Sequence, residues 1–149
     1  MLVDTATDVV VDGVPAEIRK TILVADDESH ILHVVSLKLR NAGYNVLTAR
    51  DGQEALDLAL AERPDLLITD YHMPELSGLE LCQRLKQHPS TSGIPAIMLT
   101  ARGYNLEPAD TESSGIRHML SKPFSPRQLL TMVNEVLQKN EVVPSNLAA

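Results

Sequence analysis

Carboxylates stand directly after two apolar runs of this sequence, where a strand would leave a sheet. Asp26 and Asp27 follow the run at 21–25, and Asp70 follows the run at 66–69. Uncharged runs of this length are typical of strands buried on both faces of a parallel sheet. Ligands of open α/β sheets bind at the carboxyl ends of the strands. We therefore predict that Asp70 is the reactive residue, and that the three carboxylates share one site if the two strands are neighbours in the sheet.

Thr100 and Lys122 occupy similar places after two later runs. Thr100 ends the run at 94–100, and Lys122 follows the shorter run at 117–121. In a parallel sheet both residues would join the three carboxylates at one edge. Like charges held close together raise one another's pKa unless a cation neutralises them. Because an all-oxygen pocket suits a hard divalent ion, we expect a Mg²⁺ site here.

The chemistry that fits these residue types is phosphoryl transfer to Asp70. Beside a divalent cation, Asp70 stays ionised and can attack phosphorus as a carboxylate nucleophile. Phosphoryl transfer mainly needs positioning and charge neutralisation, which Mg²⁺ and the Lys122 ammonium would supply. The Thr100 hydroxyl could then donate a hydrogen bond to a phosphoryl oxygen. The product would add roughly −1.5 to −2 of charge beside Thr100 and Lys122.

Alternating strand and helix signals must position these residues. The expected strands span residues 21–25, 44–49, 65–70, 94–100 and 117–121. The expected helices span residues 28–42, 51–63, 77–88 and 125–139, with a short or poorly anchored helix between 102 and 115. Asp51, Ser77 and Ser125 are typical N-caps, each followed three residues later by Glu or Gln. The alternation predicts an α/β fold, a five-stranded parallel sheet with helices on both faces.

Composition and charge argue against several classes of function. The length of 149 residues suits one domain, and the 3% aromatic content implies an aliphatic core. A net charge of −7 argues against binding nucleic acid or anionic membranes. Cys82 is the only cysteine, so no internal disulfide can form, and we expect a packed thiol in a reducing compartment. With no apolar run near the roughly 18 residues of a membrane span and no signal peptide, we expect a soluble, cytoplasmic protein.

Four motifs stand at the ends of successive predicted strands. They are Val24-Ala25-Asp26-Asp27, Asp70 with Met73-Pro74 and Gly78, Leu99-Thr100-Ala101, and Lys122-Pro123-Phe124. In this order they resemble the receiver domain of two-component response regulators, in its single-domain, chemotaxis-regulator-like form. The resemblance covers about residues 20–139, which leaves 1–19 as a flexible leader and 140–149 as a flexible tail. Val9 to Val11 in the leader could also form an edge strand.

Strand order does not follow from pattern alone, which allows a nucleotide-binding or a flavodoxin-like arrangement. With the resemblance we expect the flavodoxin-like order 2-1-3-4-5. The resemblance also implies that Asp70 is the phosphoacceptor. Mg²⁺ would lie on Asp27, Asp70 and the backbone carbonyl of His72, with Asp26 acting through water. Lys122 would pair with the phosphoryl group.

The resemblance further implies that Thr100 acts as a switch and that the Lys122-Pro123 bond is cis, since the cis form of an X-Pro bond costs only about 0.5–1 kcal/mol. Three residues before Lys122, where the family usually has an aromatic residue, this chain has Met119. A thioether is flexible and lacks a ring, which leaves the coupling of Thr100 to the surface open. Our hypothesis is that the face around 102–115 is mobile before phosphorylation and becomes ordered by it or by a partner.

Structural roles are alternatives for most of these residues. The pair Asp26-Asp27 could cap the first helix, Thr100 could be an ordinary strand end, and Lys122 could be solvated. The His72 side chain could bind the metal, although we expect it exposed beside the site, where its size could shield or admit water. Arg102 could gate access in the same way.

The function we expect is a phosphorylation-driven signalling switch. Its phosphoryl group would come from a sensor histidine kinase or a phosphotransfer protein. It would catalyse at most its own phosphorylation and dephosphorylation. We expect a downstream protein target on the face around residues 102–124, and no nucleic-acid or membrane partner. No output domain is expected after residue 139, so the chain would act through protein contacts, relay phosphate, or be a fragment of a longer regulator.

Two other classes of function are alternatives. One is a receiver-like protein-interaction module that works without phosphorylation. The other is an enzyme. A phosphatase with an Asp nucleophile usually carries a second acid two residues later, where this chain has His72. A flavodoxin needs amide and hydroxyl donors after strand one, where Asp26, Asp27 and Glu28 would repel a phosphate.

Overall fold

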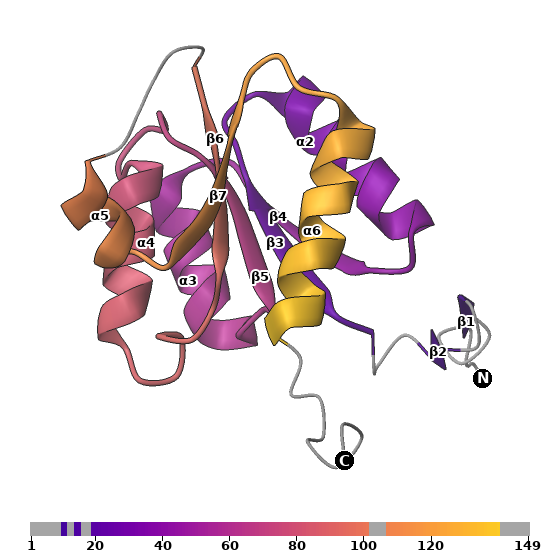
Figure 1. The fold of residues 1–149 in the computed structure, drawn as a ribbon, viewed down its shortest axis with the longest axis horizontal. Coiled ribbons are helices and arrows are strands. Elements are labelled where there is room, and N and C mark those ends of the chain that lie inside the picture. Colours follow the sequence, from indigo (N-terminus) through magenta and orange to yellow (C-terminus); the bar gives the residue numbers. More distant parts are fainter. Residues whose placement is uncertain (1–9, 12–13, 16–18, 102–106, 141–149) are drawn as a thin grey trace.

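In the computed structural model, the described residues are 10–11, 14–15, 19–101 and 107–140. Five parallel strands form one sheet (Figure 1): β3 (Thr21–Ala25), β4 (Asn45–Ala49), β5 (Leu66–Asp70), β6 (Ala96–Thr100) and β7 (Ile116–Ser121). Their order is β4-β3-β5-β6-β7. This confirms the predicted flavodoxin-like order 2-1-3-4-5, and it makes β3 and β5 neighbours.

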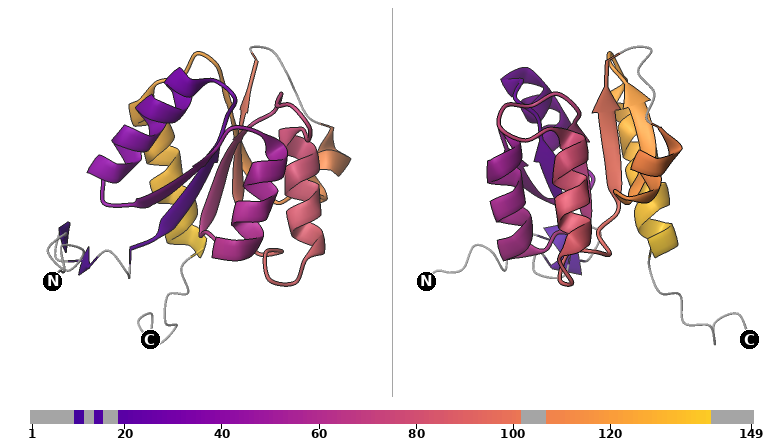
Figure 2. Two further views of the ribbon diagram at one scale, coloured as in Figure 1. Left: turned by 180° about the vertical axis from the view of Figure 1, so that it is seen from behind. Right: turned by 90° about the vertical axis from the view of Figure 1, so that its left-hand side faces the viewer.

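Helices cover both faces of the sheet, as predicted. They are α2 (Ser29–Asn41), α3 (Gly52–Glu62), α4 (Gly78–Gln87), α5 (Pro108–Glu112) and α6 (Pro126–Asn140). Helices α2 and α6 lie together over one face, whereas α3 and α4 lie over the other (Figure 1 and, from behind, Figure 2). Every connection therefore crosses from one strand to the next parallel strand through a helix.

Side-chain alternation along the strands builds two aliphatic cores. Ile22 and Val24 of β3 pack toward α2 and α6, whereas Leu23 and Ala25 pack toward α3 and α4. Strands β5 and β6 are buried at every residue. These central strands are therefore held from both sides, and the residues at their carboxyl ends are fixed in place.

Helix α2 differs in detail from the prediction. In the sequence, Ile31, Val34, Val35 and Leu39 have the spacing of an apolar helical stripe, but the side chains of Ile31 and Val34 are only half-buried. The helix instead buries Leu32, Val35, Ser36 and Leu39, which have the spacing of one helical face. Because Ser36 is polar, the apolar residues alone predict a face that is rotated toward Ile31 relative to the face that is buried. The consequence is that Ile31 and Val34 line a surface groove.

The predicted N-caps are present. Asp51 accepts a hydrogen bond from the Glu54 amide at 2.8 Å. Ser77 and Glu80 form a complete capping box at the start of α4, with bonds of 3.1 and 3.0 Å. Ser125 accepts bonds of 3.2 and 3.4 Å at the start of α6. The caps of α3 and α4 set these helix starts directly behind the carboxyl edge of the sheet.

The remaining elements are small. Helix α5 spans only five residues, as expected for the weak segment between 102 and 115, whose residues 102–106 lie outside the described ranges. Val10–Val11 (β1) and Val14–Pro15 (β2) form a separate antiparallel pair rather than an edge of the main sheet. Most of the predicted leader and tail lies outside the described residues. Among the helices described, none has the length and apolar character needed to cross a membrane.

Candidate functional site

The two carboxylates after β3 and the one that ends β5 meet at the carboxyl edge of the sheet. Ala25 is in register with Thr69, so the next positions along the two strands lie side by side. One oxygen from each of Asp26, Asp27 and Asp70 lies within 4.8 Å of the other two. Asp26 is fully buried and Asp70 is only 7% exposed, whereas Asp27 is exposed. The predicted cluster of three carboxylates is therefore present.

Lys122 reaches this cluster from the far side of the sheet. Its amide donates to the Thr100 carbonyl at 2.8 Å, which fixes its backbone beside β6. Its Nζ lies 3.0 Å from Asp26 Oδ2 and 3.2 Å from Asp70 Oδ1. A third carboxylate, Glu28, is closer still, with its Oε1 2.7 Å from Nζ. The following peptide bond, Lys122-Pro123, is cis as predicted.

The electrostatics of the cluster follow from burial and crowding. Burial raises the pKa of Asp70 to about 6, and the nearby Asp26 charge adds to the rise, although Lys122 opposes it. Burial also raises the pKa of Asp26. For Lys122, burial alone would lower the pKa, but its bonds to Glu28 and Asp26 outweigh that effect and raise it. A single ammonium therefore only partly compensates the crowded carboxylates.

The donor set fits a hard divalent cation. The three carboxylates are close enough together to bind one ion, and they offer only oxygen ligands, which Mg²⁺ prefers. Asp26 Oδ2 is buried and accepts no well-oriented hydrogen bond from the described residues, although Lys122 Nζ lies near it. A cation would satisfy that oxygen and relieve the repulsion that raises the pKa of Asp70.

Thr100 ends β6 beside Lys122. The residue is 1% exposed, and its Oγ1 finds no hydrogen-bond partner among the described residues. Buried hydroxyls are nearly always hydrogen-bonded, because an unpartnered one costs free energy. This hydroxyl is therefore free to donate to an oxygen that enters the site.

The loop after Asp70 is held by backbone hydrogen bonds. The Tyr71 amide donates to the Leu99 carbonyl at 2.9 Å, and the Gly78 amide donates to the Tyr71 carbonyl at 2.8 Å. His72 is exposed, as expected, and its ring lies edge-on to Tyr71. Within the described part of the chain its imidazole is not a member of the ligand cluster, which disfavours a metal-binding side chain. Arg102 lies outside the described residues.

Two residues singled out by the sequence have packing roles. Met119 lies in β7 opposite Met98 and is half-buried against the core that contains α3 and α4. Cys82 is buried in the same core, and burial raises the pKa of its thiol to about 12. The prediction that Cys82 is packed is confirmed, and such a thiol is unreactive at neutral pH.

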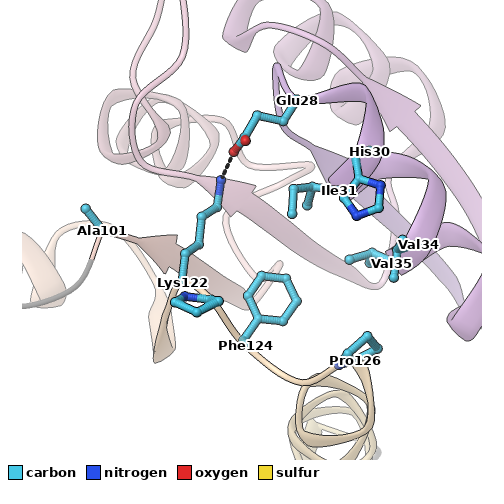
Figure 3. A pocket seen from close by; sticks show the side chains of 10 residues that line it. Glu28, His30, Ile31, Val34, Val35, Ala101, Lys122, Phe124 and Pro126 are labelled. Carbon is cyan, nitrogen blue, oxygen red and sulfur yellow. Dashed lines mark hydrogen bonds and ion pairs between the residues drawn. The ribbon is translucent and has the colours of Figure 1, made fainter.

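Sequence reasoning missed the ion pair of Glu28. Glu28 was assigned to the start of a helix, where its side chain needs no distant partner. The sequence did offer a signal: Glu28 is a third acid directly after the Asp26-Asp27 pair. It therefore lies at the carboxyl edge of the sheet, where Lys122 also lies. Beside this ion pair a groove of about 630 Å³ opens between α2 and the segment after β7, with Ile31 and Phe124 in its walls (Figure 3).

Comparison with known proteins identifies the family that has this arrangement. The sequence profile of the response regulator receiver domain matches residues 22–134. The chain belongs to the response regulator receiver family. Receiver domains generally pair with histidine kinases and are not enzymes in the usual sense. The fold and the acidic cluster described above are those expected of the family.

Relatives with known names are similar over most of the chain. The alkaline phosphatase synthesis transcriptional regulatory protein PhoP of Bacillus subtilis is 38% identical over 124 residues, which cover 83% of this chain and 51% of that protein. The phosphate regulon transcriptional regulatory protein PhoB of Pseudomonas aeruginosa is 38% identical over 82% of this chain and 53% of its own length. The receiver therefore spans about half the length of these curated relatives.

Solved structures show the same fold. A putative response regulator from Chloroflexus aurantiacus superposes with a TM-score of 0.74 at 38% identity, covering 80% of this chain and 98% of that one. The chemotaxis response regulator CheY4 of Vibrio cholerae gives a TM-score of 0.73 at 34% identity, covering 79% of this chain and 98% of that one. The similarity extends over nearly the whole of both solved chains.

Proposed function

We propose that this receiver is a phosphoacceptor switch of a two-component phosphorelay and that Asp70 accepts the phosphoryl group. The observation that carries the proposal is the position of Asp70. It ends the buried central strand, shares one edge with Asp26 and Asp27, and lies 3.2 Å from Lys122 Nζ. The donor would be a sensor histidine kinase or a phosphotransfer protein.

The reaction transfers a phosphoryl group from the donor to Asp70, and side chains of the receiver itself catalyse the transfer. A carboxylate oxygen of Asp70 forms a bond to phosphorus while the bond from phosphorus to the donor breaks, and the leaving group takes that electron pair. Lys122, which already lies beside the Asp70 carboxylate, balances charge on the phosphoryl oxygens. Attack by water on phosphorus later returns Asp70 as a carboxylate and releases inorganic phosphate. The receiver thus catalyses at most its own phosphorylation and dephosphorylation.

The acidic residues would hold the required cation. Asp27, Asp70 and the backbone carbonyl of His72 would bind Mg²⁺ directly, and Asp26 would act through water. When bound, Mg²⁺ supplies the positive charge that draws the phosphoryl oxygens to the site. The carboxylates of Asp26, Asp27 and Asp70 are close enough together for one ion, which supports the assignment of these three side chains.

The signal would leave through Thr100 and the face around residues 102–124. The Thr100 hydroxyl would donate to a phosphoryl oxygen and so satisfy its missing hydrogen bond. Met119 replaces the usual aromatic residue on this face, so the surface would change by repacking a flexible side chain. The downstream target would be a protein, and the cytoplasmic location stays a prediction.

The test is intact mass after incubation with Mg²⁺ and acetyl phosphate. Wild type is expected to gain one phosphoryl group only when Mg²⁺ is present, and Asp70→Asn is expected to gain none. Asp57→Asn is a matched control, since it removes an exposed acid of α3 and should leave the gain intact. If the wild type neither gains a phosphoryl group nor binds Mg²⁺, the proposal is overturned. That result would favour an interaction module that works without phosphate.

A further inference from the structure

Glu28 is a carboxylate beside the site, and the proposed function gives it no role in binding the metal or the phosphoryl group. Its Oε1 lies 2.7 Å from Lys122 Nζ, compared with 3.0 Å for Asp26 and 3.2 Å for Asp70. The closest partner of the lysine is therefore a side chain outside the three-carboxylate cluster. That side chain is 59% exposed, whereas the Asp26 side chain is fully buried.

The position of Glu28 in the fold explains why it points toward Lys122. It is the N-cap residue of α2, yet its side chain makes no capping hydrogen bond. Its backbone amide instead donates to Asp26 Oδ1 at 2.9 Å, which fixes Glu28 beside the cluster. The side chain then extends to Lys122 and closes an ion pair between the start of α2 and the end of β7 (Figure 3).

Among the described residues, the well-oriented hydrogen bond of the Lys122 ammonium goes to Glu28, whereas Asp26 and Asp70 contact it as ion pairs. An ammonium group offers three N–H donors, and three carboxylate oxygens surround Nζ. A phosphoryl group on Asp70 would bring further acceptor oxygens to the same nitrogen, and a carboxylate that competes with them would give up its place beside Nζ. Glu28 can do so at the lowest cost, because an exposed carboxylate exchanges its ion pair for water, whereas a buried one cannot.

We propose that Glu28 is a positioning residue that holds Lys122 before phosphorylation and competes with the incoming phosphoryl group for it. The inference rests on the proposed function, since it assumes that Asp70 accepts phosphate. Glu28 acts through Lys122 and through its own negative charge at the mouth of the site. Both effects oppose a negatively charged donor. Glu28 therefore slows phosphorylation and weakens the hold on a phosphoryl group.

The main test compares Glu28→Gln with wild type at saturating Mg²⁺. We expect phosphorylation by acetyl phosphate to be about two- to fivefold faster in the variant, the range that an exposed ion pair produces. The difference should shrink as salt is added, because salt screens an exposed charge. Affinity for the phosphoryl mimic beryllium trifluoride should rise in parallel. Glu28→Asp, which keeps the charge, should fall between the two proteins.

A matched control separates the local pair from net charge. Glu62→Gln removes the same charge at the end of α3, on the opposite edge of the sheet, and should match wild type in rate. A purely structural role of Glu28 would lower the melting temperature of Glu28→Gln without speeding phosphorylation. That result, or equal rates for the Glu28→Gln and Glu62→Gln variants, would overturn the inference and leave the proposed function intact. A wild type that accepts no phosphate would overturn both.

Discussion

Helices α4 and α5 follow the two strands that end in Asp70 and Thr100, yet they are anchored very differently. Helix α4 has ten residues, a complete capping box and four buried residues. Helix α5 has five residues, no side-chain cap and no buried residue. The two helices touch through a hydrogen bond from Gln83 Nε2 to Ser113 Oγ at 3.1 Å, just after the end of α5.

The contrast separates Asp70, which we propose accepts the phosphoryl group, from Thr100, which we propose transmits the change to the protein surface. Asp70 sits between a strand buried at every position and a loop tied back to the sheet by the Tyr71 and Gly78 amides. Thr100 also ends a buried strand, but the helix beyond it contributes nothing to the core. Elements with few buried contacts open at low free energy. A charge added at Asp70 would therefore move the α5 side more easily than the α4 side.

The largest predicted effect comes from truncating the core face of α4. Leu81→Ala should lower the free energy of unfolding by about 2–5 kcal/mol, because a fully buried leucine leaves a cavity. Ala109→Gly in the exposed α5 should cost about 1 kcal/mol or less. Urea denaturation measures both values. Equal losses would show that α5 is as firmly anchored as α4.

The loop after Asp70 offers a sharper test at a single atom. A Cβ at Gly78 would lie 2.2 Å from the Asp70 carbonyl oxygen, so the backbone would have to shift. Gly78→Ala should therefore lose about 1–3 kcal/mol of stability, as overpacked sites do, and should slow phosphorylation of Asp70. Gly93→Ala is the matched control, since a Cβ there would meet no described atom within 4 Å apart from its own chain neighbours, and stability should hold or rise. A Gly78→Ala protein with wild-type stability would mean that the loop is not tightly packed.

A smaller effect is expected from the helix caps. Ser77→Ala removes the acceptor for the Glu80 amide and should cost about 1 kcal/mol. The equivalent residue of α5, Glu107, makes no capping bond with its side chain, so Glu107→Ala should change stability little. Thermal unfolding of the two variants measures the comparison. A loss at Glu107 as large as that at Ser77 would contradict it.

Much of the site could be predicted because it depends on strand ends. Asp26, Asp27 and Asp70 follow or end short apolar runs that are typical of buried strands, and parallel strands end at one edge. Lys122 follows by the same logic. The pattern could not supply strand order, which depends on how helices pack; the family resemblance led to the order that the sheet confirms.

The parts that could not be predicted depend on side-chain reach and on helix rotation. The pair between Glu28 and Lys122 joins residues 94 positions apart, and no local pattern specifies it. Val35 and Leu39 were predicted for the buried face of α2 and are buried, but Leu32 and Ser36 complete that face instead of Ile31 and Val34, because a polar serine does not mark an apolar stripe. Serine is mostly an exposed residue type, so a buried serine interrupts the apolar pattern from which the face was predicted.

The smallest predicted effect tests the contact between the two regions. Gln83→Ala removes the hydrogen bond to Ser113 and should lower the free energy needed to open α5 locally by about 0.5 kcal/mol, the low end for a hydrogen bond that water can replace. The global free energy of unfolding should barely change, but amide exchange within α5 should become about twofold faster, since that bond is one of its few ties. Exchange within α4 should stay the same, because its capping box and buried residues remain. If α4 also exchanged faster, the two helices would form one cooperative unit, and a signal from Asp70 could not move α5 alone.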